Sequence, residues 1–296
     1  MENNKKLSLG LMRIESMSVE EVETLILTAY NNGITLFDHA NIYGGNKCEE
    51  LFGEVLSRNP SLREKITIQS KCGICKGYYD SSKEHIIKEV EGCINRLKCG
   101  YLDILLIHRP DALCDYQELN EALTYLYDKG LVKEFGVSNF NVWQMELFSK
   151  YVKFPIKHNQ MQYSIVHSCM VGEGLYVNMQ SPESVDRTGG LLEYCQVKDV
   201  SIQAWSPLMA SWEDGCFIDN DKYPLLNQKL DELAKKYNVK KNAIGISWIL
   251  RHPANIVPIL GTTSVTHLLE MVQALNVNIT RQEWYELYLS VGHKLP

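Results

Sequence analysis

The sequence of 296 residues lacks a long apolar run, because nowhere do about 18 apolar residues follow one another, as a membrane-spanning helix needs. The two lysines near its start are followed by no apolar segment like that of a secretory signal. It also lacks a lysine- or arginine-rich block that would neutralise a nucleic-acid backbone, and its formal charge is −6. We therefore expect a cytoplasmic protein that neither binds nucleic acid nor inserts into a membrane.

Two familiar ligand-binding motifs are also missing. There is no Gly-x-Gly-x-x-Gly turn of the kind that binds phosphate in doubly wound dinucleotide folds. Cys72 and Cys75 form a single Cys-x-x-Cys pair, without the second cysteine pair or histidine pair that a structural zinc requires. The nine cysteines are an odd number at irregular spacing, in a chain too long to depend on disulfides. We expect reduced thiols and no bound metal.

What the chain does contain is a regular alternation of short β-branched runs and helical patterns, which is typical of a parallel sheet with crossover helices. Eight runs are strand candidates: Leu7–Leu9, Ile34–Phe37, Ile66–Gln69, Leu102–Ile107, Phe135–Val137, Ile156–Asn159, Ser201–Ala204 and Ile256–Leu260. We predict one (β/α)8 TIM-barrel domain over residues 1–296, with an extra C-terminal helix at Thr280–Ser290. Non-periodic stretches near 163–188 and 208–222 are expected to be long rim loops.

Helix starts are marked by two capping-box patterns. Ser18 and Glu21 predict a helix that continues to Asn32, and Ser81 and Glu84 predict one that continues to Lys98. Further helical patterns lie at 48–57, 117–129, 141–150, 189–198, 225–237, 242–251 and 265–275.

Polar or aromatic residues follow the strand candidates at the point where each run ends: Asp38, Lys71, His108, Ser138 and Asn139, Gln160, Trp205, and the glycine Gly261. In a (β/α)8 barrel the carboxyl ends of all strands meet at one rim, which is where active sites of this fold lie. We therefore expect these side chains to gather at a single site although they are distant in sequence.

The segments around these positions resemble the aldo-keto reductases in their proper order: Gly33–Gly44, Ser70–Gly73, Leu102–Pro110, Gly136–Phe140, Asn159–Gln160 and Ala204–Leu208. The resemblance runs from Leu9 to about Leu275 and is greatest to the bacterial oxidoreductases of that family whose substrates are poorly defined. It implies a barrel that binds an extended nicotinamide dinucleotide and reduces an aldehyde or ketone to the alcohol by hydride transfer.

By this resemblance, four residues are catalytic. Tyr43 is the proton donor to the carbonyl oxygen, and the ammonium of Lys71 stabilises the phenolate that results. Asp38 holds Lys71 charged and oriented, and His108 donates to the carbonyl oxygen or shares its proton.

The resemblance also implies the cofactor residues. Trp205 would stack on the nicotinamide, whose carboxamide would be held by Ser138, Asn139 and Gln160. The remaining cofactor contacts would come from Gly10, Met12, Ser206, Pro207, Leu208, Gly261, Thr262, Thr263, Ser264, His267 and Glu270.

The chain departs from the family at the adenosine end. Members that prefer NADP(H) place Lys or Arg after the glycine of the eighth strand, to bind the 2′-phosphate, whereas this chain has Thr262, Thr263, Ser264 and then His267. NADP(H) is the first expectation because the family mostly uses it, and use of NAD(H) or of both cofactors stays open.

Two other functions deserve comparison. A nucleotide-binding regulatory or redox-sensing member with little catalysis is disfavoured by the intact set of Asp38, Tyr43, Lys71 and His108. A metal-dependent barrel hydrolase fits less well, because its rim would need several histidine or carboxylate ligands. The sequence leaves open the physiological substrate, the direction of the reaction, the oligomeric state, and whether residues 168–190 form a lid.

Overall fold

Eight parallel strands form a closed barrel in the order β1, β12, β9, β8, β7, β6, β3, β2 in the computed structural model, which describes residues 6–295. The barrel strands are β1 (Ser8–Gly10), β2 (Leu36–Asp38), β3 (Thr67–Cys72), β6 (Leu102–Ile107), β7 (Val132–Ser138), β8 (His158–Gln162), β9 (Ser201–Trp205) and β12 (Val257–Leu260). Each overlaps one of the eight predicted runs, so the predicted (β/α)8 barrel is confirmed.

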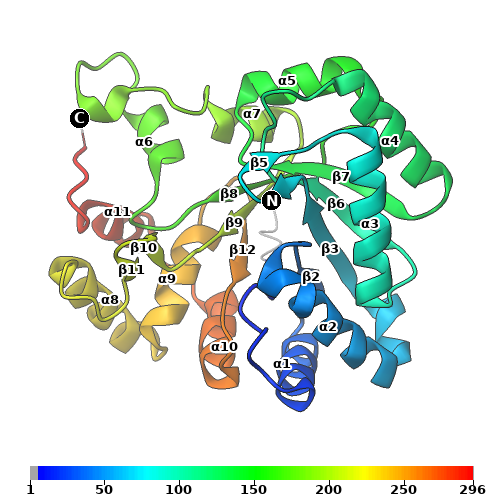
Figure 1. Cartoon of the computed structure of the whole chain (residues 1–296). Coiled ribbons are helices and arrows are strands. Elements are labelled where there is room, and N and C mark those ends of the chain that lie inside the picture. The colour runs from blue at the N-terminus through cyan, green and yellow to red at the C-terminus, as the bar shows by residue number, and fades with distance from the viewer. Residues whose placement is uncertain (1–5, 296) are drawn as a thin grey trace. The chain divides into compact units, whose positions relative to one another are not determined.

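The helices follow the strands in chain order, as Figure 1 shows by colour and label. They are α1 (Val19–Asn31), α2 (Lys47–Arg58), α3 (Lys83–Leu97), α4 (Tyr116–Asp128), α5 (Val142–Tyr151), α6 (Cys169–Leu175), α7 (Leu191–Val197), α8 (Pro224–Tyr237), α9 (Lys241–Leu250), α10 (Val265–Val272) and α11 (Arg281–Leu289). All of the predicted helical segments are found, with ends that differ by a few residues.

Backbone contacts divide the chain into two compact units. The first consists of Ser8–Gln160 together with Gly261–Val265, and the second consists of Met161–Leu260 and the chain from Thr266 onward, with the residues before Ser8. The organisation of the chain as a single domain stays a prediction.

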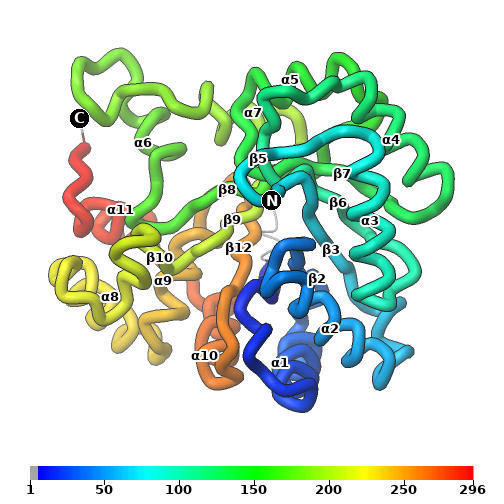
Figure 2. The backbone as a smooth tube through the Cα atoms, viewed as in Figure 1, coloured from blue at the N-terminus to red at the C-terminus, as the bar shows by residue number. Residues whose placement is uncertain are grey.

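In the first unit, neighbouring strands pair in parallel and bury an apolar layer between the sheet and its helices. Phe37 of β2 pairs in register with Leu9 of β1 and with Ile68 of β3, and all three side chains are fully buried. Helix α2 packs between α1 and α3, which can be followed in the tube of Figure 2. This packing fixes the carboxyl ends of β2 and β3 beside each other, where Asp38 and Lys71 lie.

The predicted capping boxes differ in outcome. Ser18 caps α1 as predicted, with Glu21 returning a hydrogen bond to the Ser18 backbone. The prediction for Ser81 is wrong, because α3 begins after Ser82, whose side chain makes no capping bond. The N–H groups at this end donate instead to Asp80 and, from Lys83, to Glu118 Oε1 at 3.1 Å. A carboxylate from the next helix can satisfy a helix start as well as a local serine can.

In the second unit, the stretches expected to be loops contain short elements. Residues 163–188 include α6 and a 3-10 turn, η3 (Pro182–Ser184), and residues 208–222 include the hairpin of β10 (Met209–Ser211) and β11 (Gly215–Cys216). These elements are too short to show a hydrophobic period, since α6 spans only seven residues.

The predicted C-terminal helix is confirmed as α11 and is fixed to α9 by two tryptophans. The rings of Trp248 and Trp284 stack with centroids 4.7 Å apart. Each indole N–H donates to the backbone carbonyl of the other residue, at 3.0 Å in both directions. The pair therefore buries two large rings without leaving either N–H unsatisfied.

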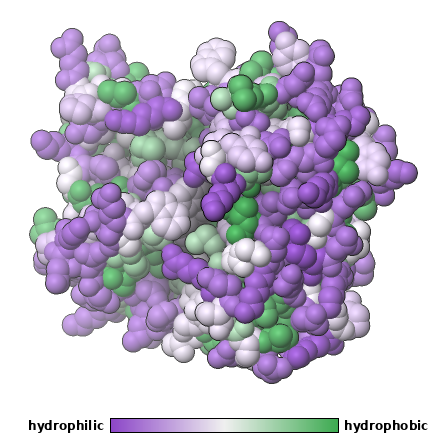
Figure 3. Space-filling view, in the orientation of Figure 1, coloured by the Kyte–Doolittle hydropathy of each residue, from purple (hydrophilic) through white to green (hydrophobic). Residues whose placement is uncertain are grey.

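The surface is mainly hydrophilic on the face shown in Figure 3, where apolar residues occur in small, separate patches. Among residues 6–295, no helix is both long and apolar enough to span a membrane.

Candidate active site

The four residues predicted to be catalytic all lie in the first unit, at the carboxyl ends of three adjacent strands. Asp38 is the last residue of β2, Lys71 lies near the end of β3, and His108 follows β6 directly. Tyr43 opens a short 3-10 turn, η1 (Tyr43–Asn46), between β2 and α2.

Lys71 is the centre of the group. Its side chain is fully buried, and its Nζ donates to three oxygens: Asp38 Oδ2 at 2.8 Å, the His39 carbonyl at 2.6 Å and the Tyr43 hydroxyl at 3.1 Å. An ammonium has three protons to donate, so this set satisfies it completely. The geometry brings Asp38, Lys71 and Tyr43 into one hydrogen-bonded chain.

Asp38 is held from its other side as well. Its Oδ1 accepts hydrogen bonds from Gln69 Nε2 and, at 3.0 Å, from Gln160 Nε2. The carboxylate is 3% exposed, so its lone pairs must be satisfied by protein groups rather than by water. The two amides therefore fix the orientation of the carboxylate that pairs with Lys71.

Charge and burial act in opposite directions on Lys71 and Tyr43. Burial lowers the pKa of Lys71, but Asp38 and the Tyr43 hydroxyl outweigh it, so the pKa lies above its usual value. Burial raises the pKa of Tyr43, against the opposing effect of the Lys71 charge. Lysine is therefore an ammonium and tyrosine a neutral phenol near pH 7, which is the form of each that proton donation from tyrosine requires.

His108 lies beside the phenol. Its ring centroid is 6.2 Å from that of Tyr43, with the rings nearly perpendicular at 83°. Burial, and to a smaller degree the charges of Lys71 and Arg109, lower the pKa of His108 to about 2. The imidazole is therefore neutral near pH 7, so it can donate one hydrogen bond without carrying charge.

The turn that carries Tyr43 needs glycine for two reasons. Gly44 and Gly45 both adopt left-handed backbone angles, with φ of 54° and 59°. A Cβ on Gly44 would also lie 2.6 Å from Cβ of Glu15, closer than two side-chain carbons can approach. The Tyr-Gly-Gly sequence thus permits the tight turn that directs the phenol toward Lys71.

A buried glutamate that sequence reasoning missed supports this turn from α2. Glu49 is fully buried, and it accepts hydrogen bonds from Ser70 Oγ at 2.7 Å and from Arg96 Nε at 2.8 Å. Since Ser70 precedes Lys71 in β3, the contact ties the helix after Tyr43 to the strand of Lys71. Its position three residues before Phe52, on the apolar side of α2, was the available signal.

Three of the predicted cofactor residues form a second hydrogen-bonded group. Ser138, at the end of β7, donates through Oγ to the Gln160 carbonyl at 3.0 Å, and Asn139 Nδ2 donates to Ser138 Oγ at 2.8 Å. Gln160 links this group to Asp38 through its amide. Asn139 has a left-handed φ of 60°, as asparagine tolerates.

The other predicted cofactor residues of the first unit lie at the end of β1 and on loops. Gly10 ends β1, and the Met12 carbonyl accepts a weak hydrogen bond from the Cys48 thiol. After β12, Ser264 N–H donates to Thr262 Oγ1 at 3.0 Å, which closes a small turn that also includes Thr263 and follows Gly261.

The remaining predicted residues belong to the second unit. Trp205 ends β9 and is followed by Ser206, with a left-handed φ of 52°, then by buried Pro207 and half-buried Leu208. Its ring lies 6.2 Å from that of Trp212. On α10, His267 is exposed, and Glu270 accepts a hydrogen bond from Asn242 of α9 at 2.7 Å. The roles of these residues toward a cofactor stay predictions.

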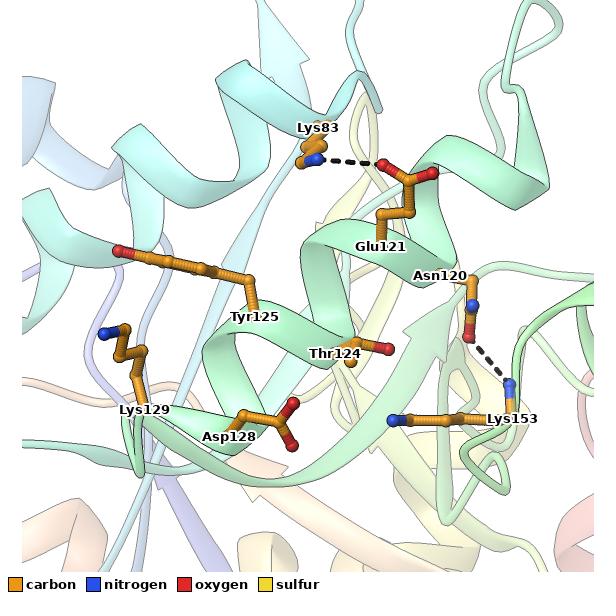
Figure 4. Close-up of a pocket in the computed structure, with 8 residues that line it drawn as sticks. All are labelled: Lys83, Asn120, Glu121, Thr124, Tyr125, Asp128, Lys129 and Lys153. Atoms are coloured by element: carbon orange, nitrogen blue, oxygen red, sulfur yellow. Dashed lines mark hydrogen bonds and ion pairs between the residues drawn. The ribbon is translucent and has the colours of Figure 1, made fainter.

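A surface depression of about 640 Å³ lies elsewhere on the first unit and contains none of the predicted site residues (Figure 4). It is lined by residues of α4, by Lys129 directly after that helix, by Lys83 at the start of α3 and by Lys153. Lys83 in this depression pairs with Glu121 at 2.8 Å, and Asn120 accepts from the Lys153 N–H. Its charges of both signs are typical of a solvated helix surface.

Within residues 6–295, no cluster of three or more His, Cys, Asp or Glu side chains is arranged to hold a metal ion. All nine cysteines lie in this part of the chain, and each is a thiol rather than half of a disulfide. The groups that the structure brings together at the strand ends are a buried lysine, a phenol, an imidazole and a carboxylate.

A barrel whose strand ends bring these four groups together is the arrangement expected of a barrel oxidoreductase. The model of the aldo/keto reductase family matches residues 6–288. The chain belongs to this family, and it is an oxidoreductase.

Several relatives match over nearly the whole length. A 6-dehydroglucose reductase of Agrobacterium fabrum is 35% identical, with 97% of this chain and 94% of that protein covered. The oxidoreductase YdhF of Escherichia coli is 33% identical, with 95% and 91% covered.

Solved structures agree with the fold. The thermostable aldo-keto reductase Tm1743, crystallised with the inhibitor epalrestat, has a TM-score of 0.76 at 28% identity and covers 96% of this chain and 94% of its own. An aldo-keto reductase of Klebsiella pneumoniae in complex with NADPH has a TM-score of 0.76 at 20% identity, with 95% and 89% covered.

The backbone carbonyl of His39 accepts a hydrogen bond from Lys71 Nζ, and the pH dependence of stability can test whether the His39 side chain is buried as well. The side chain is fully buried, and neither ring nitrogen has a hydrogen-bond partner in the described part of the chain. Burial and the Lys71 charge lower its pKa to about 3. The unfolded chain, with a histidine pKa near 6.5, takes up this proton first as the pH falls, so the contribution of His39 to stability is present above about pH 6.5 and is lost below it.

We predict that protonation of His39 in the unfolded chain lowers the free energy of unfolding by about 2 kcal/mol as the pH falls from 7 to 5. The replacement His39→Leu should reduce the pH dependence by that amount, whatever its effect on stability at pH 7. Urea unfolding at both pH values measures the difference. Equal pH dependence in the two proteins would show that His39 is not held neutral.

Proposed function

We propose that this oxidoreductase reduces an aldehyde or ketone to the alcohol with a nicotinamide cofactor, NADP(H) in the first place, and that Tyr43 donates the proton. The observation that carries the proposal is the position of Lys71 Nζ, within hydrogen-bond distance of both Asp38 and Tyr43. A phenol is a weak acid near pH 7 unless a cation stabilises its conjugate base, and Lys71 supplies that cation.

Each of the four side chains has its own role in the proposed reaction. Tyr43 gives its proton to the carbonyl oxygen, and Lys71 stabilises the phenolate as it forms. Asp38 keeps Lys71 an ammonium and in place, and neutral His108 is able to donate a second hydrogen bond to the developing alkoxide. When bound, the reduced nicotinamide supplies hydride to the carbonyl carbon.

The residues present fit such a cofactor. Ser138, Asn139 and Gln160 are joined by hydrogen bonds at the ends of β7 and β8, and Gln160 connects them to Asp38. This polar group suits a carboxamide, which both donates and accepts. We assign the stacking role to Trp205 and the other contacts to Gly10, Met12, Ser206, Pro207, Leu208, Gly261, Thr262, Thr263, Ser264, His267 and Glu270.

The substrate class is supported by relatives. Two of them, at 35% and 30% identity, are named 6-dehydroglucose reductases, which makes that compound the first carbonyl to test. We propose a small-molecule carbonyl substrate and retain the cytoplasm as the location, in keeping with nine cysteines that are all thiols.

The replacement Tyr43→Phe should remove the proton donor while keeping the ring. We predict that kcat for carbonyl reduction falls at least about a hundredfold, the usual contribution of general acid catalysis, with cofactor affinity nearly unchanged. Steady-state kinetics and a fluorescence titration with the cofactor measure the two quantities.

Tyr125→Phe, which removes a hydroxyl from an exposed tyrosine of α4, is the matched control and should leave kcat unchanged. Full turnover by Tyr43→Phe would refute the assignment. If the native protein binds cofactor but reduces no member of a broad carbonyl panel, the regulatory role would be favoured instead.

The cofactor preference depends on the residues assigned to the adenosine part of the cofactor. There Thr262, Thr263 and Ser264 supply hydroxyls, and His267 is the nearest basic residue along α10. We predict that NADPH is preferred only modestly over NADH. Thr262→Lys should raise the ratio of kcat/KM values in favour of NADPH about tenfold, by adding a charge-assisted contact to the 2′-phosphate.

Gln228→Lys, which adds the same charge on the exposed face of α8, is the control and should leave the ratio unchanged. A strong preference of the native protein for NADPH would contradict the prediction, because it would mean that hydroxyls and helix amides suffice for discrimination.

A further inference from the structure

A second group of reactive side chains lies outside the catalytic four, around the short hairpin that follows β3. Cys75 belongs to β4 (Ile74–Cys75), which pairs with β5 (Tyr78–Tyr79), and His85 lies in the first turns of α3. Cys75 Sγ is 3.7 Å from His85 Nε2, and His85 Nδ1 is 3.8 Å from Asp80 Oδ2. Thiol, imidazole and carboxylate thus stand in a row.

A glycine turn and local hydrogen bonds hold the hairpin and the Asp80 carboxylate in place. Gly77 adopts a left-handed φ of 88° and lets the chain reverse between Cys75 and Tyr78. Asp80 N–H donates to the Gly73 carbonyl at 2.9 Å, and Asp80 Oδ1 accepts from Ser82 N–H at the start of α3. The carboxylate is therefore fixed by a helix start, and its other oxygen faces the imidazole.

A row of this kind activates a thiol. The thiolate is the nucleophilic form of cysteine, and a neighbouring imidazole favours it by accepting the proton. A carboxylate at the other ring nitrogen orients the imidazole and stabilises its charged form. The side chains of His85 and Asp80 are 17% and 29% exposed, and Cys75 is half-buried, so a small reagent can reach them.

Other half-buried thiols lack this setting. Burial and three nearby carboxylates, of Asp111, Asp115 and Glu118, raise the pKa of Cys114 to about 12. Burial also raises the pKa of Cys169, with Glu173 adding to it. Negative neighbours oppose thiolate formation, whereas Cys75 Sγ lies 3.7 Å from a nitrogen of His85. The Tyr78 hydroxyl and the Cys72 thiol also lie near Cys75.

We propose that Cys75 is a modification site for soft carbon electrophiles of the α,β-unsaturated carbonyl class. The thiol proton passes to His85, and the sulfur forms a bond to the β-carbon as the carbon–carbon double bond opens into an enolate. The α-carbon then takes the proton from His85. The net change is addition of S–H across the double bond, which needs no oxidant or reductant.

Acrylamide, a simple member of this class, tests the proposal on the native full-length protein. At pH 7 and limiting reagent, the rate of addition at each cysteine is followed by mass spectrometry of peptides. Cys216, which is exposed on β11, serves as the internal reference. We expect Cys75 to react at least about tenfold faster than Cys216.

The replacement His85→Gln should bring the rate at Cys75 down to about that at Cys216, and Asp80→Asn, which keeps the cap oxygen for α3, should lower it less. An unchanged rate at Cys216 and an unchanged melting temperature show that the variants are folded. If Cys75 of the native protein reacts no faster than Cys216, or reacts equally fast in His85→Gln, the proposal is overturned.

Discussion

The ammonium of Lys71 is the constraint on which the site depends. Transfer of a lysine from water to a fully buried position costs several kcal/mol unless partners satisfy all of its protons. The carboxylate of Asp38, the carbonyl of His39 and the hydroxyl of Tyr43 do so together, and removal of any one would leave a buried donor without an acceptor. The same three contacts place a cation beside a phenol, so the contacts that stabilise the buried lysine are also those that the proposed proton donation by Tyr43 requires.

The surrounding structure keeps these distances fixed. Gln69 and Gln160 hold the second oxygen of Asp38, and Glu49 joins α2, the helix after Tyr43, to Ser70 beside Lys71. Arg96, whose side chain is 19% exposed, forms an ion pair with the fully buried Glu49 carboxylate, so the charge of Glu49 is compensated. An active site needs supporting contacts of this kind, because an error of about 1 Å in the position of an acid is costly to the rate.

The sequence predicted much of this arrangement, for identifiable reasons. Alternating strand and helix patterns located all eight barrel strands, and polar residues at strand ends located Asp38, Lys71 and His108. The Ser81 capping box failed because α3 is capped from another helix through Glu118, a contact between residues distant in sequence. Helix α6 and the two hairpins were missed because elements of two to seven residues show no period. Glu49 was not predicted because the sequence alone gives no role to a charged residue on the apolar face of a helix. Its partners, Ser70 and Arg96, are apparent only in the structure.

The most direct test of the account is the protonation state of Lys71, followed by nuclear magnetic resonance of protein labelled with nitrogen-15 in its lysine side chains. A Lys71→Met variant assigns the resonance. The account predicts that Nζ stays an ammonium as the pH rises past about 10.5, where an ordinary lysine loses its proton, because Asp38 and Tyr43 raise its pKa. A Lys71 side chain that is already a neutral amine near pH 7 would contradict it, since burial would then outweigh the partners and no cation would stand beside Tyr43.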